Sequence, residues 1–156
     1  MRGFSTLDNP SHKGQTDVWL TPLWIIERLG GGFDLDPCGY PGHQTAKKLF
    51  LENEGCGLSR DWGNKFVWLN PPYSDVGRWL DKLADHANGT ALVFARTDTS
   101  WAQRHFKRAA NVFFLKGRIK FLRADFTEST NAGHGSMILH YGQKRKDFNF
   151  EGWQAK

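Results

Sequence analysis

The chain has 156 residues, which suits one domain whose core hides roughly 70% of the surface that the unfolded chain would expose. Its 21 Lys and Arg residues outnumber its 16 Asp and Glu residues and give a formal charge of +5, which favours polyanionic partners. The two cysteines form no Cys-x-x-Cys pair, so we expect no zinc site, and the polar start predicts neither a secretion signal nor a membrane span. A cytoplasmic protein with free thiols is the resulting expectation.

The first part of the chain predicts a flexible arm followed by a short helix. Residues 1–15 carry few apolar side chains and include glycine and proline, so we expect an N-terminal arm without fixed structure. Thr21 and Pro22 are typical of a helix start, with the hydroxyl as the cap and the proline in the first position. They predict a helix over 22–29, which the three following glycines end.

A strand is predicted over 32–37, where polar and apolar residues alternate briefly before a proline. Asp36 then lies at the carboxyl end of this strand. Residues 43–65 contain several glycines that break any regular pattern. Within them 45–51 fits either a helix or a strand, and both alternatives stay open.

The middle of the chain predicts a strand, a helix and a second strand. The apolar run 66–69 is strand-like, and Asp75 then caps a helix over 76–87 whose apolar residues recur at helical spacing. The continuous apolar run 91–95 is typical of a strand that is buried on both faces of a parallel sheet. Ser100 is expected to cap a further helix.

The last third of the chain predicts antiparallel strands. Residues 112–115 and 118–122 flank a Lys-Gly pair, which indicates a hairpin. The polar stretch 123–134 is expected to be a loop, and 136–141 returns to a strand pattern. The charged tail 143–156 is expected to lie on the surface or to fray.

This alternation of strands and helices predicts a three-layer α/β domain over 16–142, with a mostly parallel central sheet and antiparallel strands towards the C-terminus. Ligands in such folds bind at the carboxyl ends of the strands. Asp36 and Asn70 both follow or end a predicted strand, so the sequence predicts one site that contains both residues.

Asn70, Pro71, Pro72 and Tyr73 come directly after an apolar strand and form the most informative segment. Two consecutive prolines stiffen the chain and withhold backbone donors, so nearby carbonyls remain available to a ligand. With the Asn70 side-chain oxygen they can accept both hydrogens of an amino group, while Tyr73 offers a ring for stacking a base. A rigid turn is the plain alternative. Here the chain resembles the amino-directed methyltransferases, in which this tetrapeptide is the catalytic motif.

Over 16–142 the chain is similar to a small family of phage-type DNA N6-adenine methyltransferases. The similarity consists of six segments in order: Asp17-x-Trp19-x-Thr21-Pro22, Asp34-x-Asp36-Pro37, Gly57-Leu58-Ser59, Trp68-x-Asn70-Pro71-Pro72-Tyr73, Thr97-Asp98-Thr99-x-Trp101 and Gly117-Arg118-Ile119-x-Phe121. The resemblance implies a Rossmann-like class I methyltransferase fold, S-adenosylmethionine as the methyl donor and double-stranded DNA as the substrate.

The resemblance also implies roles for single residues. The catalytic role passes to Asn70, Pro71, Pro72 and Tyr73, and cofactor binding to Trp19, Thr21, Pro22, Asp36, Pro37 and Cys38. An acid that contacts the adenosine is expected among Glu52, Glu54 and Asp61. Nucleic-acid binding passes to Thr97, Asp98, Thr99 and Trp101, for which a capped helix start is the plain alternative. A helix cap beside a buried tryptophan likewise explains Trp19, Thr21 and Pro22 equally well.

Residues 96–123 carry eight Lys and Arg side chains and one acid, Asp98, which predicts a phosphate-binding face. Within this stretch Arg118 and Lys120 alternate with apolar residues, so we expect both on one side of a strand, in contact with DNA. A solvated surface is the plain alternative.

Methylation of the N6 amino group of an adenine that has been flipped out of DNA is the favoured interpretation. Asn-Pro-Pro-Tyr also occurs in methyltransferases of RNA bases and of protein glutamine, and a nucleic-acid-binding module that has lost catalysis is a third alternative. The chain leaves little room for a separate recognition domain. Sequence discrimination must therefore come from the 123–134 loop, the N-terminal arm or a second copy of the chain in a homodimer.

Overall fold

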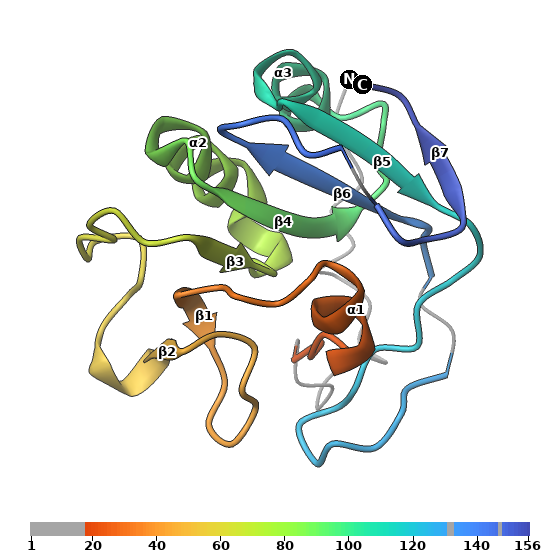
Figure 1. Cartoon of the computed structure of the whole chain (residues 1–156). Coiled ribbons are helices and arrows are strands. Elements are labelled where there is room, and N and C mark those ends of the chain that lie inside the picture. The colour runs from red at the N-terminus through yellow and green to blue at the C-terminus, as the bar shows by residue number, and fades with distance from the viewer. Residues whose placement is uncertain (1–17, 131–132, 147) are drawn as a thin grey trace, which may run out of the picture.

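The structure, a computed structural model, describes residues 18–130, 133–146 and 148–156. The N-terminal arm expected at residues 1–15 lies outside them. Within the described residues, seven strands form one sheet in the order β2-β1-β3-β4-β6-β5-β7 (Figure 1). The elements in chain order are α1 (Leu23–Arg28), β1 (Leu35–Gly39), β2 (Lys48–Leu51), η3 (Glu52–Glu54), β3 (Val67–Leu69), η4 (Tyr73–Asp75), α2 (Val76–His86), β4 (Gly89–Phe94), α3 (Ser100–Arg108), β5 (Asn111–Leu115), β6 (Ser136–Tyr141) and β7 (Gly152–Gln154).

The first four strands run parallel to one another. β1 pairs in parallel with both β2 and β3, and β3 pairs in parallel with β4. β6 lies antiparallel between β4 and β5, so β5 runs in the same direction as β4. The edge strand β7 is antiparallel to β5. This sheet confirms the predicted α/β class with a mostly parallel centre and antiparallel C-terminal strands.

Helices cover both faces of the sheet, with α2 and α3 on one face and α1 on the other (Figure 1). Neighbouring residues of one strand point to opposite faces, so Val67 and Leu69 pack in the core under α2 and α3, while Trp68 packs in the core that contains α1. All three side chains are fully buried, as expected for a parallel strand covered on both sides. The predicted three layers are therefore present. No helix in the described ranges is long and apolar enough to cross a membrane.

The predicted hairpin of 112–115 with 118–122 is wrong. β5 pairs with β6 on one side and with β7 on the other, so neither of its edges is left for residues 118–122. These residues form single bridges instead, in which Leu122 pairs with Leu20 and with Glu128. The alternation of charged and apolar residues over 118–122 does not come from a strand. It arises because Ile119 and Phe121 are buried in the core next to α1.

The charged tail lies on the surface, as one of the two expectations has it, but Gly152–Gln154 does not fray and forms the exposed edge strand β7. The reason is aromatic packing. Trp153 stacks on Phe114 with ring centres 6.1 Å apart, and Phe148 stacks on Phe113 at 5.3 Å. These contacts bury apolar surface that the charge pattern of the tail did not reveal.

Other boundaries differ by a few residues from the predictions. Pro22 is the N-cap residue of α1, and no side chain caps this helix. The hydroxyl of Thr99, one residue earlier than predicted, accepts a hydrogen bond from the Ala102 amide and caps α3. β1 continues past Asp36 to Gly39 with an irregular register, and the open 45–51 segment contains a strand, β2.

Candidate active site

The two polar residues predicted at strand ends, Asp36 and Asn70, lie towards the same edge of the sheet. β1 and β3 are parallel neighbours, with Leu35 aligned to Val67. Asp36 in β1 and Asn70 just after β3 therefore lie towards the same edge, where the carboxyl ends of parallel strands form a ligand-binding crevice. Pro71 is buried, whereas Pro72 is exposed and Tyr73 is half-buried.

The Asn70 side chain is held by the N-terminal segment. Its Nδ2 donates a 2.7 Å hydrogen bond to the main-chain carbonyl of Trp19. The Trp19 segment is itself fixed, because Leu20 and Leu122 exchange two main-chain hydrogen bonds of 2.8 and 2.9 Å. The amide is thus oriented with its oxygen as the atom left to accept a hydrogen bond. That this oxygen accepts a hydrogen of a substrate amino group stays a prediction.

Four aromatic side chains surround this corner. The Tyr73 ring lies 4.9 Å from the ring of Phe94, Phe94 lies 5.8 Å from Phe121, and Phe121 lies 6.4 Å from Trp19, all measured between ring centres. We call Trp19, Tyr73, Phe94 and Phe121 the aromatic cluster. Sequence reasoning identified Tyr73 and Trp19 but missed Phe94, which ends β4 and carries no local sign of a site.

The Tyr73 hydroxyl is buried and has no hydrogen-bond partner among the described residues. Burial raises the pKa of Tyr73 to about 12, and the Arg96 guanidinium opposes this shift. The phenol therefore stays protonated at neutral pH. Tyr73 can pack against a ligand and donate a hydrogen bond, but it cannot act as a base.

The Asp36 carboxyl group is 4% exposed, and both of its oxygens have protein partners. One oxygen accepts a 2.9 Å hydrogen bond from the Cys38 amide, and the other accepts a hydrogen bond from the Thr45 hydroxyl. Burial raises the pKa of Asp36 to about 6, which the two hydrogen bonds oppose. In this structure the carboxylate holds the loop between β1 and β2 in place.

Pro37 and Cys38 lie in the last part of β1. Pro37 is buried, and its carbonyl oxygen would lie only 2.1 Å from a Cβ atom added to Gly57. The Gly57-Leu58-Ser59 segment therefore packs against the end of β1 at a place where only glycine fits. Burial raises the pKa of the half-buried Cys38 thiol, so it is neutral rather than a nucleophile.

The N-terminal segment also contacts the loop between β1 and β2. Thr21 and Pro22 are both buried, and a ring nitrogen of His43 lies 2.7 Å from the Thr21 carbonyl oxygen. The Thr21 hydroxyl has no hydrogen-bond partner within the described part of the chain. Sequence reasoning missed His43, because nothing in its local pattern signals a contact to a residue 22 positions away.

The three acids that are candidates for contacting the adenosine have different surroundings in the structure. Glu52 directly follows β2 and is exposed at the carboxyl end of that strand. Glu54 accepts a 3.3 Å hydrogen bond from the Leu51 amide and pairs with Arg60 at 3.4 Å. Asp61 accepts a hydrogen bond from a nearby main-chain amide in its own turn.

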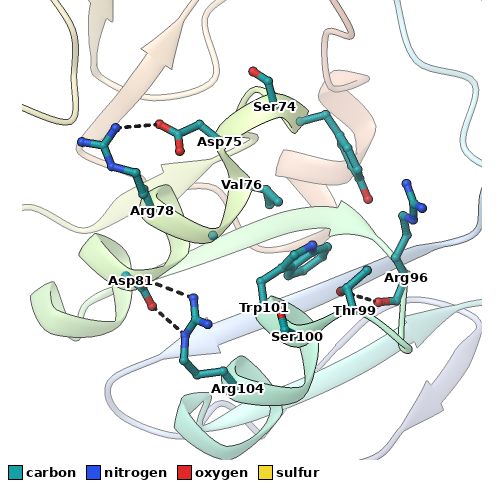
Figure 2. A pocket seen from close by; sticks show the side chains of 12 residues that line it. Ser74, Asp75, Val76, Arg78, Asp81, Arg96, Thr99, Ser100, Trp101 and Arg104 are labelled. Atoms are coloured by element: carbon teal, nitrogen blue, oxygen red, sulfur yellow. Dashed lines mark hydrogen bonds and ion pairs between the residues drawn. The ribbon is translucent and has the colours of Figure 1, made fainter. Parts of the chain in front are cut away.

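A cleft of about 500 Å³ opens beside Tyr73, between the start of α2 and the start of α3 (Figure 2). It is lined by Tyr73, Ser74, Asp75, Val76, Gly77, Arg78, Asp81, Arg96, Thr99, Ser100, Trp101 and Arg104. Of the predicted nucleic-acid residues, Thr99 and Trp101 line this cleft, whereas Thr97 and Asp98 are exposed in the turn before it. The capping role of Thr99 is present as well.

Some cations of the basic stretch 96–123 are paired with acids, which the local sequence did not suggest. Arg104 and Arg108 both pair with Asp81 of α2, at 3.1 and 3.5 Å. The acids of α2 lie far from this stretch in sequence, so counting charges locally missed the pairing. Arg118 and Lys120 are exposed, and Lys120 lies 3.9 Å from Glu128.

Two buried histidines have structural partners. His140, in β6, contacts the Thr90 hydroxyl at 2.7 Å and the Gln143 carbonyl at 2.9 Å. The fully buried His105 lies between the Asp81 carboxylate, at 3.0 Å, and the Tyr141 hydroxyl, at 2.9 Å. Over the described ranges, no group of three or more His, Cys, Asp or Glu side chains is arranged to hold a metal ion.

Comparison with known proteins identifies the family. Residues 9–149 match the family described as DNA N-6-adenine-methyltransferase (Dam). The chain is 29% identical over 138 residues to the DNA N-6-adenine-methyltransferase of Haemophilus phage HP1, covering 81% of this chain and 79% of the relative. It is 31% identical over 120 residues to the protein of the same name from Escherichia phage T1, covering 72% of this chain and 47% of that relative. No solved structure matches the chain. Because the family match includes the Asn-Pro-Pro-Tyr corner and nearly all of the sheet, the chain belongs to the DNA N-6-adenine-methyltransferase (Dam) family.

Proposed function

We propose that the edge of the sheet formed by β1, β3 and β4 is the active site at which this chain, a DNA N6-adenine methyltransferase by family, transfers a methyl group to an extruded adenine. The observation that carries the proposal is the Asn70 side chain. Its amide nitrogen donates a hydrogen bond to the Trp19 carbonyl, so its oxygen is the atom left to accept a hydrogen bond from a ligand.

Asn70 acts by accepting a hydrogen bond. The N6 nitrogen of adenine is a poor nucleophile because its lone pair is delocalised into the ring. Acceptance of its two hydrogens by the Asn70 oxygen and the Pro71 carbonyl draws the nitrogen towards tetrahedral geometry and stabilises the positive charge that develops on it. An amide is not a strong base, so positioning and electrostatics carry the rate, and the proton leaves to solvent.

Tyr73 receives the base. An adenine must leave the DNA stack before its amino group can react, and an aromatic ring replaces part of the lost stacking. Phe94 lies beside the Tyr73 ring at 4.9 Å, which supports a fixed ring position. Pro71 and Pro72 keep this corner rigid because each ring fixes one backbone dihedral.

The residues at the carboxyl ends of β1 and β2 fit S-adenosylmethionine. When bound, this cofactor supplies an electrophilic methyl group on a positively charged sulfur. Glu52 follows β2 and is exposed, which is where α/β folds of this kind place the acid that binds a ribose. Because Gly57 packs closely on Pro37, main-chain atoms rather than side chains lie at the end of β1. Asp36 orders the loop between β1 and β2.

The proposed cofactor site also contains Trp19, Thr21, Pro22 and Cys38. The contact of the Thr21 carbonyl with His43 and that of the Trp19 carbonyl with Asn70 support this assignment. The first contact joins the N-terminal segment to the loop between β1 and β2, and the second joins it to the residue that follows β3. The buried Thr21 hydroxyl, which lacks a protein partner in the described residues, is a further polar group for the cofactor.

The strand order supports a Rossmann-like class I methyltransferase fold, because parallel β1 to β4 are followed by the antiparallel β6 inserted between β4 and β5. Double-stranded DNA is the proposed substrate. Both relatives come from bacteriophages, which supports a reaction in the cytoplasm of a bacterial host. The exposed Arg118, Lys120, Thr97 and Asp98 are proposed to contact DNA, and a homodimer is proposed as one source of sequence discrimination.

The test is direct. Unmethylated plasmid DNA is incubated with the protein and S-adenosylmethionine, digested to nucleosides and analysed by mass spectrometry for N6-methyladenine. Parallel reactions with RNA and with a protein substrate separate this function from the two alternative acceptors. N6-methyladenine in DNA is the expected product, and methylation confined to RNA or protein would overturn the proposal.

A further inference from the structure

Arg96 lies beside the catalytic corner, where its guanidinium group opposes the rise in the pKa of Tyr73. It follows β4 by two residues, is exposed, and lines the same cleft as Tyr73 (Figure 2). The central carbon of its guanidinium group is 6.0 Å from the centre of the Tyr73 ring. A cation therefore lies next to the ring on which the extruded base is proposed to stack.

Arg96 is also the uncompensated charge of this cleft. The cleft contains two other arginines, and Figure 2 shows each of them joined to an acid. Arg78 pairs with Asp75 at 3.1 Å, and Arg104 pairs with Asp81 at 3.1 Å. Among the described residues no carboxylate pairs with Arg96. The three arginines and two acids thus leave one positive charge, and it lies at the Tyr73 end.

The cleft carries donors that suit a phosphate group. Ser74 follows Tyr73 and Ser100 begins α3, and both side chains are exposed at the cleft. Guanidinium and hydroxyl groups are donors that bind DNA phosphates, and such contacts fix the position of the backbone.

We propose that Arg96 binds a DNA phosphate next to the extruded adenine, in the cleft between α2 and α3. The inference rests on the proposed function, because it takes Tyr73 as the stacking surface of the target base. An extruded base has lost its own stacking, so a backbone contact close to it offsets part of that cost. Arg96 is a positioning residue and does not touch the reacting atoms.

The experiment compares Arg96→Ala with Lys65→Ala as a charge-matched control. Lys65 is exposed and lies just before β3, at the amino end of this strand, whereas the cleft lies beyond its carboxyl end. Binding to a short random-sequence duplex is measured by fluorescence anisotropy from about 50 to 200 mM salt. We expect Arg96→Ala to reduce the slope of log K against log salt by about 0.9, the value for one phosphate contact, while Lys65→Ala keeps the wild-type slope.

Kinetics provide the second readout. We expect Arg96→Ala to raise KM for plasmid DNA about tenfold, with kcat and S-adenosylmethionine affinity close to wild type, because the lost hydrogen bond to a charged group contributes to binding rather than chemistry. Arg96→Lys, which keeps the charge, should restore the salt slope.

The possible failures are distinguishable. A wild-type protein that makes no N6-methyladenine would refute the proposed function itself. A wild-type protein that is active, with an Arg96→Ala slope equal to that of Lys65→Ala, would refute the phosphate contact alone. A fall in melting temperature together with an unchanged slope would assign Arg96 a purely structural role.

Discussion

The side-chain nitrogen of Asn70 lies 2.7 Å from the main-chain oxygen of Trp19, to which it donates a hydrogen bond. This contact joins two residues that are 51 positions apart in the chain. Because an amide has one donor end and one acceptor end, fixing the nitrogen also fixes the direction of the oxygen. The N-terminal segment thus orients the group that we propose to accept the hydrogens of the substrate amino group.

Asn70→Ala should lower methyl transfer at least about a hundredfold, because it removes an acceptor that acts on charge developing in the transition state. The free energy of unfolding should fall by only about 1 kcal/mol, since one partly exposed hydrogen bond is lost. Tritiated methyl incorporation and calorimetric titration with S-adenosylmethionine measure the two effects separately. Asn64→Ala, at an exposed asparagine far from the site, should leave both unchanged. Near-normal turnover of Asn70→Ala would remove Asn70 from the mechanism.

Gly57→Ala should disturb the proposed cofactor site. An added Cβ would lie 2.1 Å from the Pro37 carbonyl oxygen, so the end of β1 must move. We expect a loss of roughly 1–3 kcal/mol in the free energy of unfolding and weaker binding of S-adenosylmethionine. Urea unfolding and calorimetric titration measure these. Gly133→Ala is the matched control, because nothing lies within 4 Å of its added Cβ. Equal affinities of the two variants would show that this packing does not shape the site.

The Asp36 carboxyl group should make the free energy of unfolding depend on pH, in the direction opposite to that of a carboxyl group whose pKa is lowered by folding. Its pKa is raised from 3.8 to about 6 by burial, so between these values the folded protein keeps a proton that the unfolded chain has released. The free energy of unfolding then decreases as pH rises through this window. Relative to Asp36→Asn, which does not titrate, the wild type should lose roughly 2 kcal/mol between about pH 4.5 and about pH 7.

Urea unfolding of both proteins at the two pH values measures this difference. A gap between wild type and Asp36→Asn that is constant with pH would mean that the carboxyl group titrates normally. Comparison with the variant is essential, because His105 and His140 also have lowered pKa values caused by burial. Those groups act in the opposite direction, and they contribute equally to both proteins.

Replacing Arg118 and Lys120 together with glutamine should weaken DNA binding and reduce the salt slope by about 1–2, according to whether one or both contact phosphates. The double variant Lys65→Gln with Lys144→Gln removes the same charge from exposed positions at the opposite edge of the sheet. Anisotropy titrations over a range of salt concentrations compare the two. Equal slopes would mean that the segment after β5 does not contact DNA.

The local predictions that succeeded depend on residues close together in sequence. The corner at Asn70 was predictable because two prolines fix the backbone wherever they occur. The helix over 76–87 was predictable because Trp79, Leu80 and Leu83 recur at helical spacing, and they are buried in the structure. Strand β4 was recognisable as an apolar run because both of its faces are covered.

The predictions that failed depend on partners distant in the chain. Residues 118–122 had a strand pattern, but β6 and β7 occupy both edges of β5. Strand β7 had no clear pattern and forms because Trp153 stacks on Phe114. Pairing between strands is non-local, so a short pattern cannot tell which edge is already taken.

By itself the sequence determined the rigid Asn-Pro-Pro-Tyr corner, the α/β class and the excess of positive charge, because these follow from local backbone chemistry and composition. Only the tertiary structure decided that Trp19 orients Asn70, that Arg104 pairs with Asp81 and that, within the described residues, Arg96 is the arginine of the cleft without a paired carboxylate. Hydrogen bonds and ion pairs act over a few ångströms in space, and folding rather than chain order sets those distances.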